Sequence, residues 1–342
     1  MSPSQPCPPS IAIALVNYCA RDLTVDCLRS LEPEVALWPG CEVVVADNAS
    51  PDGSGAEIAK AIQDSGWSHW ARVLALPKNG GFSYGNNGII REQLARTDAP
   101  VYIWLLNTDT IVRPGALRAL IEFMEMHPNA GFAGSGLEFP DATRQCSAFR
   151  FHSIGSEFEG SVNLGIITRL MKSSVVAPRL SGQGGRYDWL SGASMLTRTS
   201  VFHDVGLMDE DYFLYYEETD FCRRALAHGW TCWYVPESRV IHLVGKSTGV
   251  TDVASRGKRR ARYWFQSRRR YFLKHHGLVY ATLADLALAV GTAFSLLRHV
   301  IERRPSAVPQ HFLWDLARES AVLNPGSMPS GADPSISDRC RQ

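Results

Sequence analysis

The feature that most constrains the fold is a regular alternation of short apolar runs with stretches of helical length. The apolar runs are rich in β-branched residues and cover residues 11–16, 42–46, 72–76 and 101–106. Between them lie residues 23–31, 55–65 and 86–96, each long enough to form a helix. Such runs are typical of buried parallel strands. The alternation predicts a doubly wound α/β sheet whose ligands bind beyond the carboxyl ends of the strands.

The alternation continues less regularly along the rest of the chain. We expect a helix over residues 114–126, a strand over 131–137, a strand over 189–197, a helix over 218–228 and a strand over 232–235. Residues 138–187 are irregular and rich in Gly and Ser, so loops and a small subdomain over the site are expected there.

Composition argues against several classes of protein. The 342 residues carry 35 basic and 34 acidic side chains, so no overall charge attracts a polyanion, and no nucleic-acid partner is expected. The eight cysteines form no C-x-x-C pair, and the first ten residues contain four prolines and no Lys or Arg. These features favour a reduced cytoplasmic location without a signal peptide.

The chain becomes basic toward its C-terminus. Residues 253–284 contain no acid, and aromatic residues alternate there with nine cations: Arg256, Lys258, Arg259, Arg260, Arg262, Arg268, Arg269, Arg270 and Lys274. A basic helix with aromatics is typical of contact with an anionic membrane surface, which we expect through residues 256–301. The alternative is packing on the rest of the chain or a second subunit, with solvated cations. RNA binding is disfavoured because no RNA-binding signature accompanies the cations.

An apolar pattern follows the basic run. Apolar residues recur at steps of three and four at Val279, Leu283, Leu286, Val290, Phe294, Leu297 and Ile301. This spacing predicts a helix with one apolar face, which Pro305 ends. A transmembrane span over residues 278–297 is not favoured, because Asp285 interrupts it. The face could meet a membrane, the rest of the chain or a second copy, so oligomer formation stays open.

Polar side chains follow each of the first three predicted strands. Asn17 follows the first strand and Asp47 the second, where a carboxylate can accept hydrogen bonds from a nucleobase or ribose. Asp47 also suits a simple turn cap. The third strand leads into residues 78–87, whose glycines allow close approach of a ligand and whose asparagines can bond a sugar or phosphate. A plain glycine-rich turn is the alternative there.

Acidic residues follow the fourth strand and precede a later helix. Asn107 and Asp109 project to the same side of an extended segment, and Asp109 can bind a divalent cation that also holds a diphosphate, although a plain turn fits the segment equally well. Near residue 218, several acids stand beside an aromatic run, and Glu218 is our candidate general base, with Asp220 and Glu217 as alternatives. His242 ends a later apolar run, where an imidazole is either structural or a metal ligand.

Taken in order, these motifs resemble the family 2 glycosyltransferases of the GT-A fold, in the rhamnosyltransferase-like branch. The resemblance covers residues 11–247 and rests on Val-Asn-Tyr, Asp-Asn-Ala-Ser-x-Asp-Gly-Ser, Asn-x-Gly-Phe-x-x-Gly-Asn-Asn, Leu-Asn-x-Asp, Trp-x-Ser-Gly-Ala, Tyr-Glu-Glu-x-Asp and His-x-x-Gly-x-Ser. It implies an α/β fold, a single Rossmann-like catalytic domain of the nucleotide-diphospho-sugar transferase type, with a C-terminal helical extension. Residues 10–250 would form that domain, with a nucleotide-sugar half at 10–110 and an acceptor half at 111–250, followed by a basic helical region at 255–325.

The resemblance also implies roles for individual residues. The donor-binding residues would be Asn17, Asp47, Asn79, Gly81, Phe82, Asn86, Asn107 and Asp109, within a donor loop that runs to Asn87; the acceptor side would hold Trp189, Ser191, Gly192 and Glu217. Asp109 and His242 would bind Mg²⁺ or Mn²⁺, and Glu218 stands where the family places its catalytic Asp. Two residues depart from the family pattern: Asn107 replaces the first acid of D-x-D, and Glu218 is longer than Asp by one methylene.

The activity implied is inverting, metal-dependent transfer of a sugar, L-rhamnose from dTDP-rhamnose, to a hydroxyl of a glycan or lipid-linked glycan. The protein would act in polysaccharide biosynthesis at the inner face of the cell membrane. Transfer from a UDP-sugar such as galactofuranose or glucose, and an inactive membrane-surface scaffold, are the alternatives. A pyrophosphorylase or a dinucleotide oxidoreductase would need a glycine-rich phosphate loop after the first strand, where this chain has Asn17-Tyr-Cys-Ala-Arg21.

Overall fold

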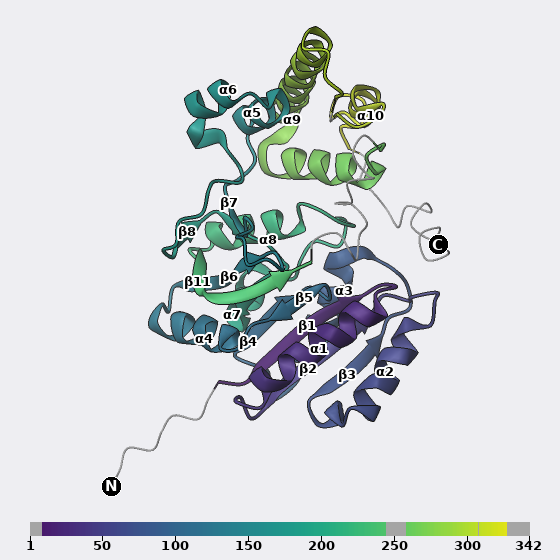
Figure 1. The fold of residues 1–342 in the computed structure, drawn as a ribbon, viewed down its shortest axis with the longest axis vertical. Helices are drawn as coiled ribbons and strands as arrows, with labels where there is room; N and C mark the ends of the chain where they lie inside the picture. Colours follow the sequence, from purple (N-terminus) through teal and green to yellow (C-terminus); the bar gives the residue numbers. More distant parts are fainter. Residues whose placement is uncertain (1–8, 244–257, 307, 327–342) are drawn as a thin grey trace.

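The computed structural model describes residues 9–243, 258–306 and 308–326, and it contains a large mixed sheet flanked by helices (Figure 1). The strands run in the order β3-β2-β1-β4-β10-β6-β11-β5, and β8 pairs with β11. Their bounds are β1 Ile11–Asn17, β2 Cys41–Asp47, β3 Ala71–Ala75, β4 Tyr102–Leu106, β5 Thr110–Val112, β6 Ala130–Glu138, β8 Gly185–Tyr187, β10 Ser194–Arg198 and β11 Thr231–His242. A separate pair joins β7 (Ala148–Phe149) to β9 (Trp189–Leu190).

The helices flank the sheet and form a further layer at one end. They are α1 Arg21–Val35, α2 Ser54–Asp64, α3 Gly81–Leu94, α4 Ala116–Met126, α5 Ile154–Val162, α6 Gly165–Leu170, α7 Thr199–Val205, α8 Glu217–Ala227, α9 Arg262–Ile301 and α10 Phe312–Arg318, with short 3₁₀ turns at Trp67–His69 and Lys172–Ser174. The prediction of an α/β catalytic fold followed by C-terminal helices is confirmed.

The four strands predicted first are confirmed as parallel neighbours. β1 pairs in parallel with β2 and β4, and β2 pairs in parallel with β3. Residues on both faces of β1, β2 and β4 are buried, which explains why the sequence shows continuous apolar runs there, whereas β3 at the edge of the sheet is mostly half-buried. The C-terminal half of the sheet is mixed, because β10 runs antiparallel to both β4 and β6.

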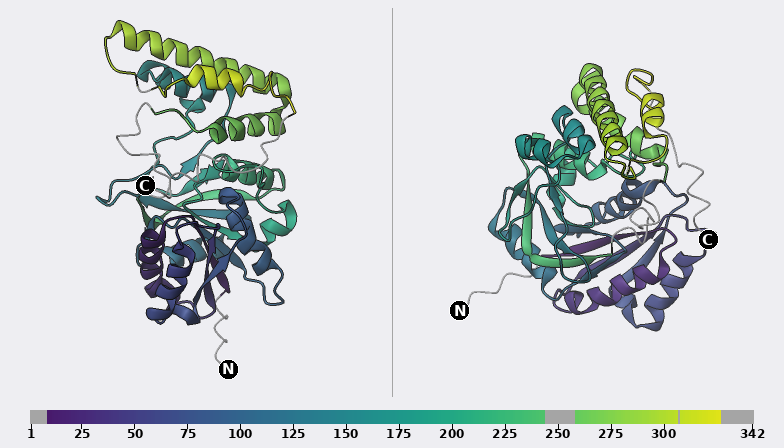
Figure 2. Two further views of the ribbon diagram at one scale, coloured as in Figure 1. Left: turned by 90° about the vertical axis from the view of Figure 1, so that its right-hand side faces the viewer. Right: turned by 45° about the horizontal axis from the view of Figure 1, so that its top comes forward.

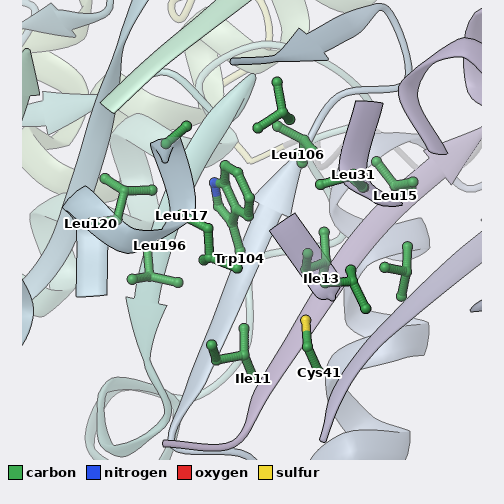
Figure 3. Close-up of a cluster of buried hydrophobic side chains, with 14 of the residues drawn as sticks. Ile11, Ile13, Leu15, Leu31, Cys41, Trp104, Leu106, Leu117, Leu120 and Leu196 are labelled. Carbon is green, nitrogen blue, oxygen red and sulfur yellow. The ribbon is translucent and has the colours of Figure 1, made fainter. Parts of the chain in front are cut away.

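A core cluster on one face of the sheet surrounds Trp104 (Figure 3). Ile13 and Leu15 of β1 point to this face and meet side chains of α1 and α4, such as Leu31 and Leu117. Each fully buried aliphatic side chain contributes about 1.5–3 kcal/mol. This packing fixes the strand that carries Asn17 at its end.

Three predicted elements have different bounds in the structure. α3 begins at Gly81 rather than residue 86, because Gly81 has φ of +86° and lets the chain turn into the helix early. The strand expected over residues 189–197 is divided by a turn into β9 and β10. β11 extends well beyond the predicted residues 232–235, because the strand accommodates Pro236 at a bulge between Val235 and Arg239.

The helical layer consists of α5, α6, α9 and α10, at the end of the molecule opposite α2 and β3 (Figures 1 and 2). Residues 138–187, expected to be irregular, supply β7, α5, α6 and β8. α5 begins with a capping box between Ser153 and Ser156, and it packs along α9. α9 is kinked at Gly277, where φ is +78°, so it consists of two segments, residues 262–276 and 278–301.

Two cations of the first α9 segment, Arg268 and Arg269, are buried, whereas Arg262 at its start is exposed. Arg268 is 1% exposed and pairs with Glu157 and Asp285, and Arg269 pairs with Glu319. The interpretation of Arg268 and Arg269 as part of a lipid-facing surface is therefore wrong, and the alternative of packing on the rest of the chain is correct for these two side chains. Because each charge has a partner of opposite sign, burial is tolerated. Arg256 of the basic run, and Gly245 and Ser247 of the His-x-x-Gly-x-Ser motif, lie outside the residues that the structure describes.

Candidate active site

The carboxyl ends of β1 and β2 bring Asn17 and Asp47 together as register partners. The Asn17 amide donates to Asp47 Oδ1 at 2.8 Å and to Ser54 Oγ at 3.0 Å, and its oxygen accepts from Thr24 Oγ1 at 3.1 Å. Asn17 is fully buried, whereas Asp47 is 8% exposed. Asn17 thus orients the Asp47 carboxylate, and Asp47 is the member of the pair that reaches the surface.

The glycine-rich loop after β3 is held against the end of β2 and the segment before α8. The Asn48 amide donates to the Gly81 carbonyl at 2.9 Å, and the Phe82 N–H donates to the Phe213 carbonyl at 3.0 Å. A Cβ on Gly81 would lie 2.0 Å from the Phe213 oxygen, and its φ is positive. Only glycine fits this position. The close approach to the loop that was predicted for a ligand is made at Gly81 by the backbone carbonyl of Phe213.

The asparagines of this loop build the start of α3. Asn79 Oδ1 accepts from the Gly81 N–H at 3.1 Å, and the Asn86 amide donates to the Phe82 carbonyl at 3.0 Å. Asn87 bonds both the carbonyl and the N–H of Met208, which ties α3 to the segment before α8. These bonds shape the predicted donor loop.

Asp109 and His242, far apart in the sequence, meet at the edge where β4 and β11 end. His242 Nε2 lies 3.4 Å from Asp109 Oδ1, and the Leu243 N–H donates to the Asp109 carbonyl at 2.9 Å. Asp109 is 1% exposed. A carboxylate oxygen and an imidazole nitrogen converging in this way suit a divalent cation such as Mn²⁺. Among the described residues, no group of three or more His, Cys, Asp or Glu side chains forms a complete set of metal ligands.

The turn between β9 and β10 connects the Asp109 segment to Glu218. The Asn107 N–H donates to the Ala193 carbonyl at 3.1 Å, and the Gly192 N–H donates to Glu218 Oε1 at 3.0 Å. A Cβ on Gly192 would lie 2.5 Å from Glu218 Oε1 and 2.9 Å from the Phe82 ring. Residues from the predicted donor loop, from the segment predicted to bind a metal and from the predicted acceptor side therefore converge on this turn.

Glu217 and Glu218 stand at the N-terminus of α8, after two tyrosines in left-handed conformation. Burial and then the charge of Glu218 raise the pKa of Glu217 well above its ordinary value. Burial also raises the pKa of Glu218, although the Gly192 N–H opposes the shift. Among the described side chains, no cation forms an ion pair with either carboxylate, and Glu217 Oε2 is buried without a hydrogen-bond partner. A carboxylate with a raised pKa is suited to accept a proton.

Asp220, the alternative base, is in a different environment. It is fully buried and accepts from His275 Nε2 at 2.7 Å, Lys274 Nζ at 2.7 Å and Arg224 Nε at 2.8 Å. Although burial opposes ionisation, these partners hold the pKa of Asp220 well below its ordinary value. Asp220 therefore fixes α8 to α9, and its oxygen atoms are occupied by protein groups.

The predicted acceptor wall is anchored on the β7–β9 pair. The Trp189 indole donates to the Arg150 carbonyl at 2.9 Å and stacks on Phe149 with ring centroids 4.1 Å apart. One face of the indole is therefore covered by Phe149. The Ser191 N–H donates to the Ser147 carbonyl at 3.0 Å, which places the turn that carries Gly192.

Several residues that shape the site were missed in the sequence. Ser50 donates to Asp47 Oδ1 at 2.6 Å, and a Cβ on Gly55 would lie 2.7 Å from the Asp47 carboxylate. Phe213 carries the carbonyl that holds the glycine-rich loop. Ser50 and Gly55 stand within or beside the quoted Asp47 motif, which was a usable signal, whereas the backbone role of Phe213 leaves no trace in its side-chain type.

Comparison with solved structures shows the fold. A mannosyltransferase from Pyrobaculum calidifontis, in complex with GDP-mannose and Mn²⁺, superimposes with a TM-score of 0.52 at 13% identity, covering 93% of this chain and 82% of that one. GalNAc-T7 with UDP, GalNAc and Mn²⁺ gives 0.54 at 12% identity, covering 94% of this chain and 59% of that one. The architecture is that of the GT-A glycosyltransferases.

Sequence comparison shows the class and the family. The model of glycosyl transferase family 2 matches residues 10–173, and that of glycosyl transferase family group 2 matches residues 102–316. An N-acetylglucosaminyl-diphospho-decaprenol L-rhamnosyltransferase of Mycobacterium tuberculosis is 29% identical over 255 residues, 71% of this chain and 74% of its own length. Rhamnosyltransferase WbbL of Escherichia coli K12 is 31% identical over 169 residues, 47% of this chain and 60% of its own length. The protein is a glycosyltransferase. It belongs to glycosyl transferase family 2, in its rhamnosyltransferase-like branch.

Proposed function

We propose that this glycosyltransferase moves L-rhamnose from dTDP-rhamnose to a hydroxyl of a lipid-linked glycan, at the cytoplasmic face of a membrane. Two similar proteins from different bacteria are named rhamnosyltransferases, and the one from M. tuberculosis is named for a decaprenol-linked acceptor. The geometric observation that carries the chemistry is the turn at Gly192, which bonds Glu218 and adjoins the contact with Asn107.

The donor occupies the carboxyl edge of the parallel strands. Asp47, oriented by Asn17 and Ser50, accepts hydrogen bonds from the nucleobase or ribose. The loop from Asn79 to Asn87 surrounds the donor sugar, with Phe82 between the donor and the turn at Gly192. Asn107 supplies a neutral contact beside the diphosphate.

Asp109 and His242 would hold a divalent cation, Mg²⁺ or Mn²⁺, with the remaining ligands supplied by the diphosphate and water. When bound, that cation supplies positive charge to the departing nucleoside diphosphate. The cations in two solved structures of the same fold support this proposal.

Glu218 acts as the general base. Its carboxylate accepts the proton of the acceptor hydroxyl while the hydroxyl oxygen attacks the anomeric carbon, and the nucleoside diphosphate leaves from the opposite face. The configuration is therefore inverted in a single displacement. The Gly192 N–H holds Oε1 in place, which leaves Oε2 for the acceptor. Trp189, Ser191 and Glu217 border the acceptor side of this carboxylate.

The experiment measures nucleoside diphosphate released by the purified protein from dTDP-rhamnose, UDP-glucose and UDP-galactofuranose. Each donor is tested with Mg²⁺, Mn²⁺ or chelator, and with and without a polyprenyl-diphosphate N-acetylglucosamine acceptor. We expect metal-dependent release from dTDP-rhamnose that Asp109→Ala abolishes and that Asp141→Ala, a change of an exposed acid, preserves.

Three other outcomes correct the proposal in different ways. Release from a UDP-sugar alone would replace the donor and keep the mechanism. Release that does not increase when the lipid acceptor is added would exclude that acceptor as the substrate. Silence with every donor, together with no thermal stabilisation by any nucleotide, would favour a membrane-surface scaffold instead.

A further inference from the structure

The second segment of α9, residues 278–301, has two distinct faces. One face is made of small residues and packs on α5: Ala281, Ala284, Gly291, Thr292 and Ser295 are all buried. A Cβ on Gly291 would lie 2.0 Å from Ser161 Oγ and 2.9 Å from the Phe158 carbonyl. The small residues therefore allow the two helices to approach closely.

The opposite face carries the large apolar side chains. This outer stripe consists of Val279, Leu283, Leu286, Val290, Phe294, Leu297 and Ile301, and every member is exposed, up to 76% for Val279. The apolar face predicted from the sequence is therefore not covered by the described part of the chain. At about 1.5 Å per residue, the stripe is about 33 Å long. An apolar surface of this size marks an interaction site.

Neighbouring helices add exposed apolar side chains to the same layer. Ile166 and Leu170 of α6 are 62% and 77% exposed, and Trp314 of α10 is 67% exposed. α6 packs on α5, and α10 packs on α9. Figure 2 shows the second segment of α9 across the end of the molecule, with α6 and α10 beside it.

The charges around this end are mainly positive. Residues 160–187 contain no acid, and Arg169 and Lys172 in that region are exposed. The second α9 segment has no acid after Asp285. One acid, Glu302, follows the segment, and Arg303 and Arg304 come directly after it. These cations differ from those of the first α9 segment, which pair with acids inside the protein.

We propose that the outer stripe of α9, together with the exposed side chains of α6, docks on the surface of an anionic lipid bilayer. The helix lies in the interface, with its apolar stripe among the acyl chains and the flanking cations at the headgroups. α9 is long and apolar enough to cross a membrane by length and composition. However, the kink at Gly277, the Asp285–Arg268 pair and the face packed on α5 fix it as a surface helix.

A second copy of the chain fits this surface less well. In a two-fold dimer the same patch meets itself, so cations of one sign would face each other around the apolar contact. Headgroups of anionic lipids instead supply the opposite charge. The docking surface does not depend on which sugar is transferred; only its link to a lipid-linked acceptor rests on the proposed function.

The experiment is co-sedimentation of the purified full chain with vesicles of phosphatidylglycerol and phosphatidylcholine, without donor or acceptor. We expect binding that grows with the phosphatidylglycerol fraction and falls at least tenfold in the double variant Val290→Asp, Leu297→Asp. The matched control is Leu37→Asp, Met126→Asp, which adds the same charges at exposed apolar positions in the turn after α1 and at the end of α4 and should bind as the wild type does. Loss of two cations, in Lys172→Gln with Arg304→Gln, should weaken binding by about fivefold per cation.

Two results would overturn the proposal. One concerns vesicle binding: the wild-type chain does not co-sediment with vesicles of any composition, or the stripe variant binds them as strongly as the wild type does. The other is a dimer of the wild type, measured by light scattering, that the stripe variant converts to a monomer without any vesicle binding. Nucleoside diphosphate release with a water-soluble acceptor is measured in parallel: an active stripe variant that fails to bind vesicles is folded, and its loss of docking is separate from the chemistry.

Discussion

Glu217 and Asp220 of α8 are both buried but have opposite electrostatic surroundings. Glu217 is 2% exposed and Asp220 is fully buried, three residues further along the same helix. Burial raises the pKa of Glu217, as it does that of Glu218, whereas His275, Arg224 and Lys274 outweigh burial and lower the pKa of Asp220. Burial alone therefore does not decide the protonation of a carboxylate; the presence of a cation does.

This difference separates the acids that hold α8 in place from the acids that are suited to accept a proton. α9 contacts α8 through Asp220, and Arg270 and Lys274 of α9 also pair with Asp209 in the segment that leads into α8. The N-terminal end of the helix carries carboxylates whose charge is stabilised by backbone N–H groups and by the helix dipole. The ion pairs hold rigidly the helix that presents Glu218, and the weakly stabilised carboxylate remains able to accept a proton.

The largest effect is expected when the paired acid loses its charge. Asp220→Asn leaves Arg224, Lys274 and His275 without their anion and should lower the free energy of unfolding by about 3 kcal/mol at pH 7. Because the pKa of Asp220 is depressed in the folded protein, its contribution is present above its unfolded pKa of about 3.9 and is lost as pH falls further. Urea unfolding at pH 7 and at pH 3 measures both effects.

The control for that variant is Asp141→Asn, a change of an exposed acid whose hydrogen-bond partner is Thr143. It should leave the urea midpoint unchanged at both pH values. If Asp220→Asn were no less stable than this control, the cations around Asp220 would be fully solvated in the folded protein, and the contrast along α8 would disappear.

Loss of charge at Glu218 should reduce turnover without destabilising the fold. Glu218→Gln should reduce kcat by about 100-fold or more, the usual contribution of a general base, while the donor dissociation constant stays unchanged. Because the pKa of Glu218 is raised on folding, its charge opposes folding above the unfolded value of about 4.3, so the variant should melt at the same or a higher temperature. Turnover near the wild-type value would assign the base to Glu217.

A smaller effect is expected when Glu218 is displaced without losing its charge. Gly192→Ala places a methyl group 2.5 Å from Glu218 Oε1 and 2.9 Å from the Phe82 ring, so the carboxylate has to move and kcat should fall by about tenfold. The control is Gly160→Ala in α5, where a Cβ meets nothing within 4 Å and where alanine favours the helix. Equal activity in the two variants would mean that the turn at Gly192 does not position the base.

The strands of the parallel half of the fold were predictable because each one is a short apolar run that can be recognised from neighbouring residues alone. The runs that form β1, β2 and β4 are buried on both faces, so these strands and their order along the chain are visible in the sequence. The position of the helical layer was not visible. The two faces of the second α9 segment are both rich in apolar or small residues, and only the contact with α5 shows which one is buried.

The site shows the same limit. Asp109 and His242 were both candidates from the sequence, and their approach to 3.4 Å depends on the pairing of β5 with β11, which no local pattern encodes. Glu218 and Asp220 were both candidate bases because the sequence shows two acids at a helix start. Of the partners that lower the pKa of Asp220, Arg224 stands on the same helix, but Lys274 and His275 are contributed by α9 from a distant part of the chain.

The smallest effect is expected from the electrostatic repulsion between the carboxylates of Glu217 and Glu218. Because burial raises the pKa of both carboxylates and the charge of Glu218 raises that of Glu217 further, kcat/KM of the wild type should fall on the acid side with an apparent pKa above the ordinary value of about 4.3. Glu217→Gln removes one of the two negative charges, so the acid limb should move to lower pH by up to about one unit. The limb is measured at saturating metal and compared with Glu237→Gln, which changes an exposed acid of β11 and should leave it in place. An unmoved limb in Glu217→Gln would mean that removal from water alone sets the protonation of Glu218. The raised pKa of the base would then depend on the turn at Gly192 and not on its neighbour along the helix.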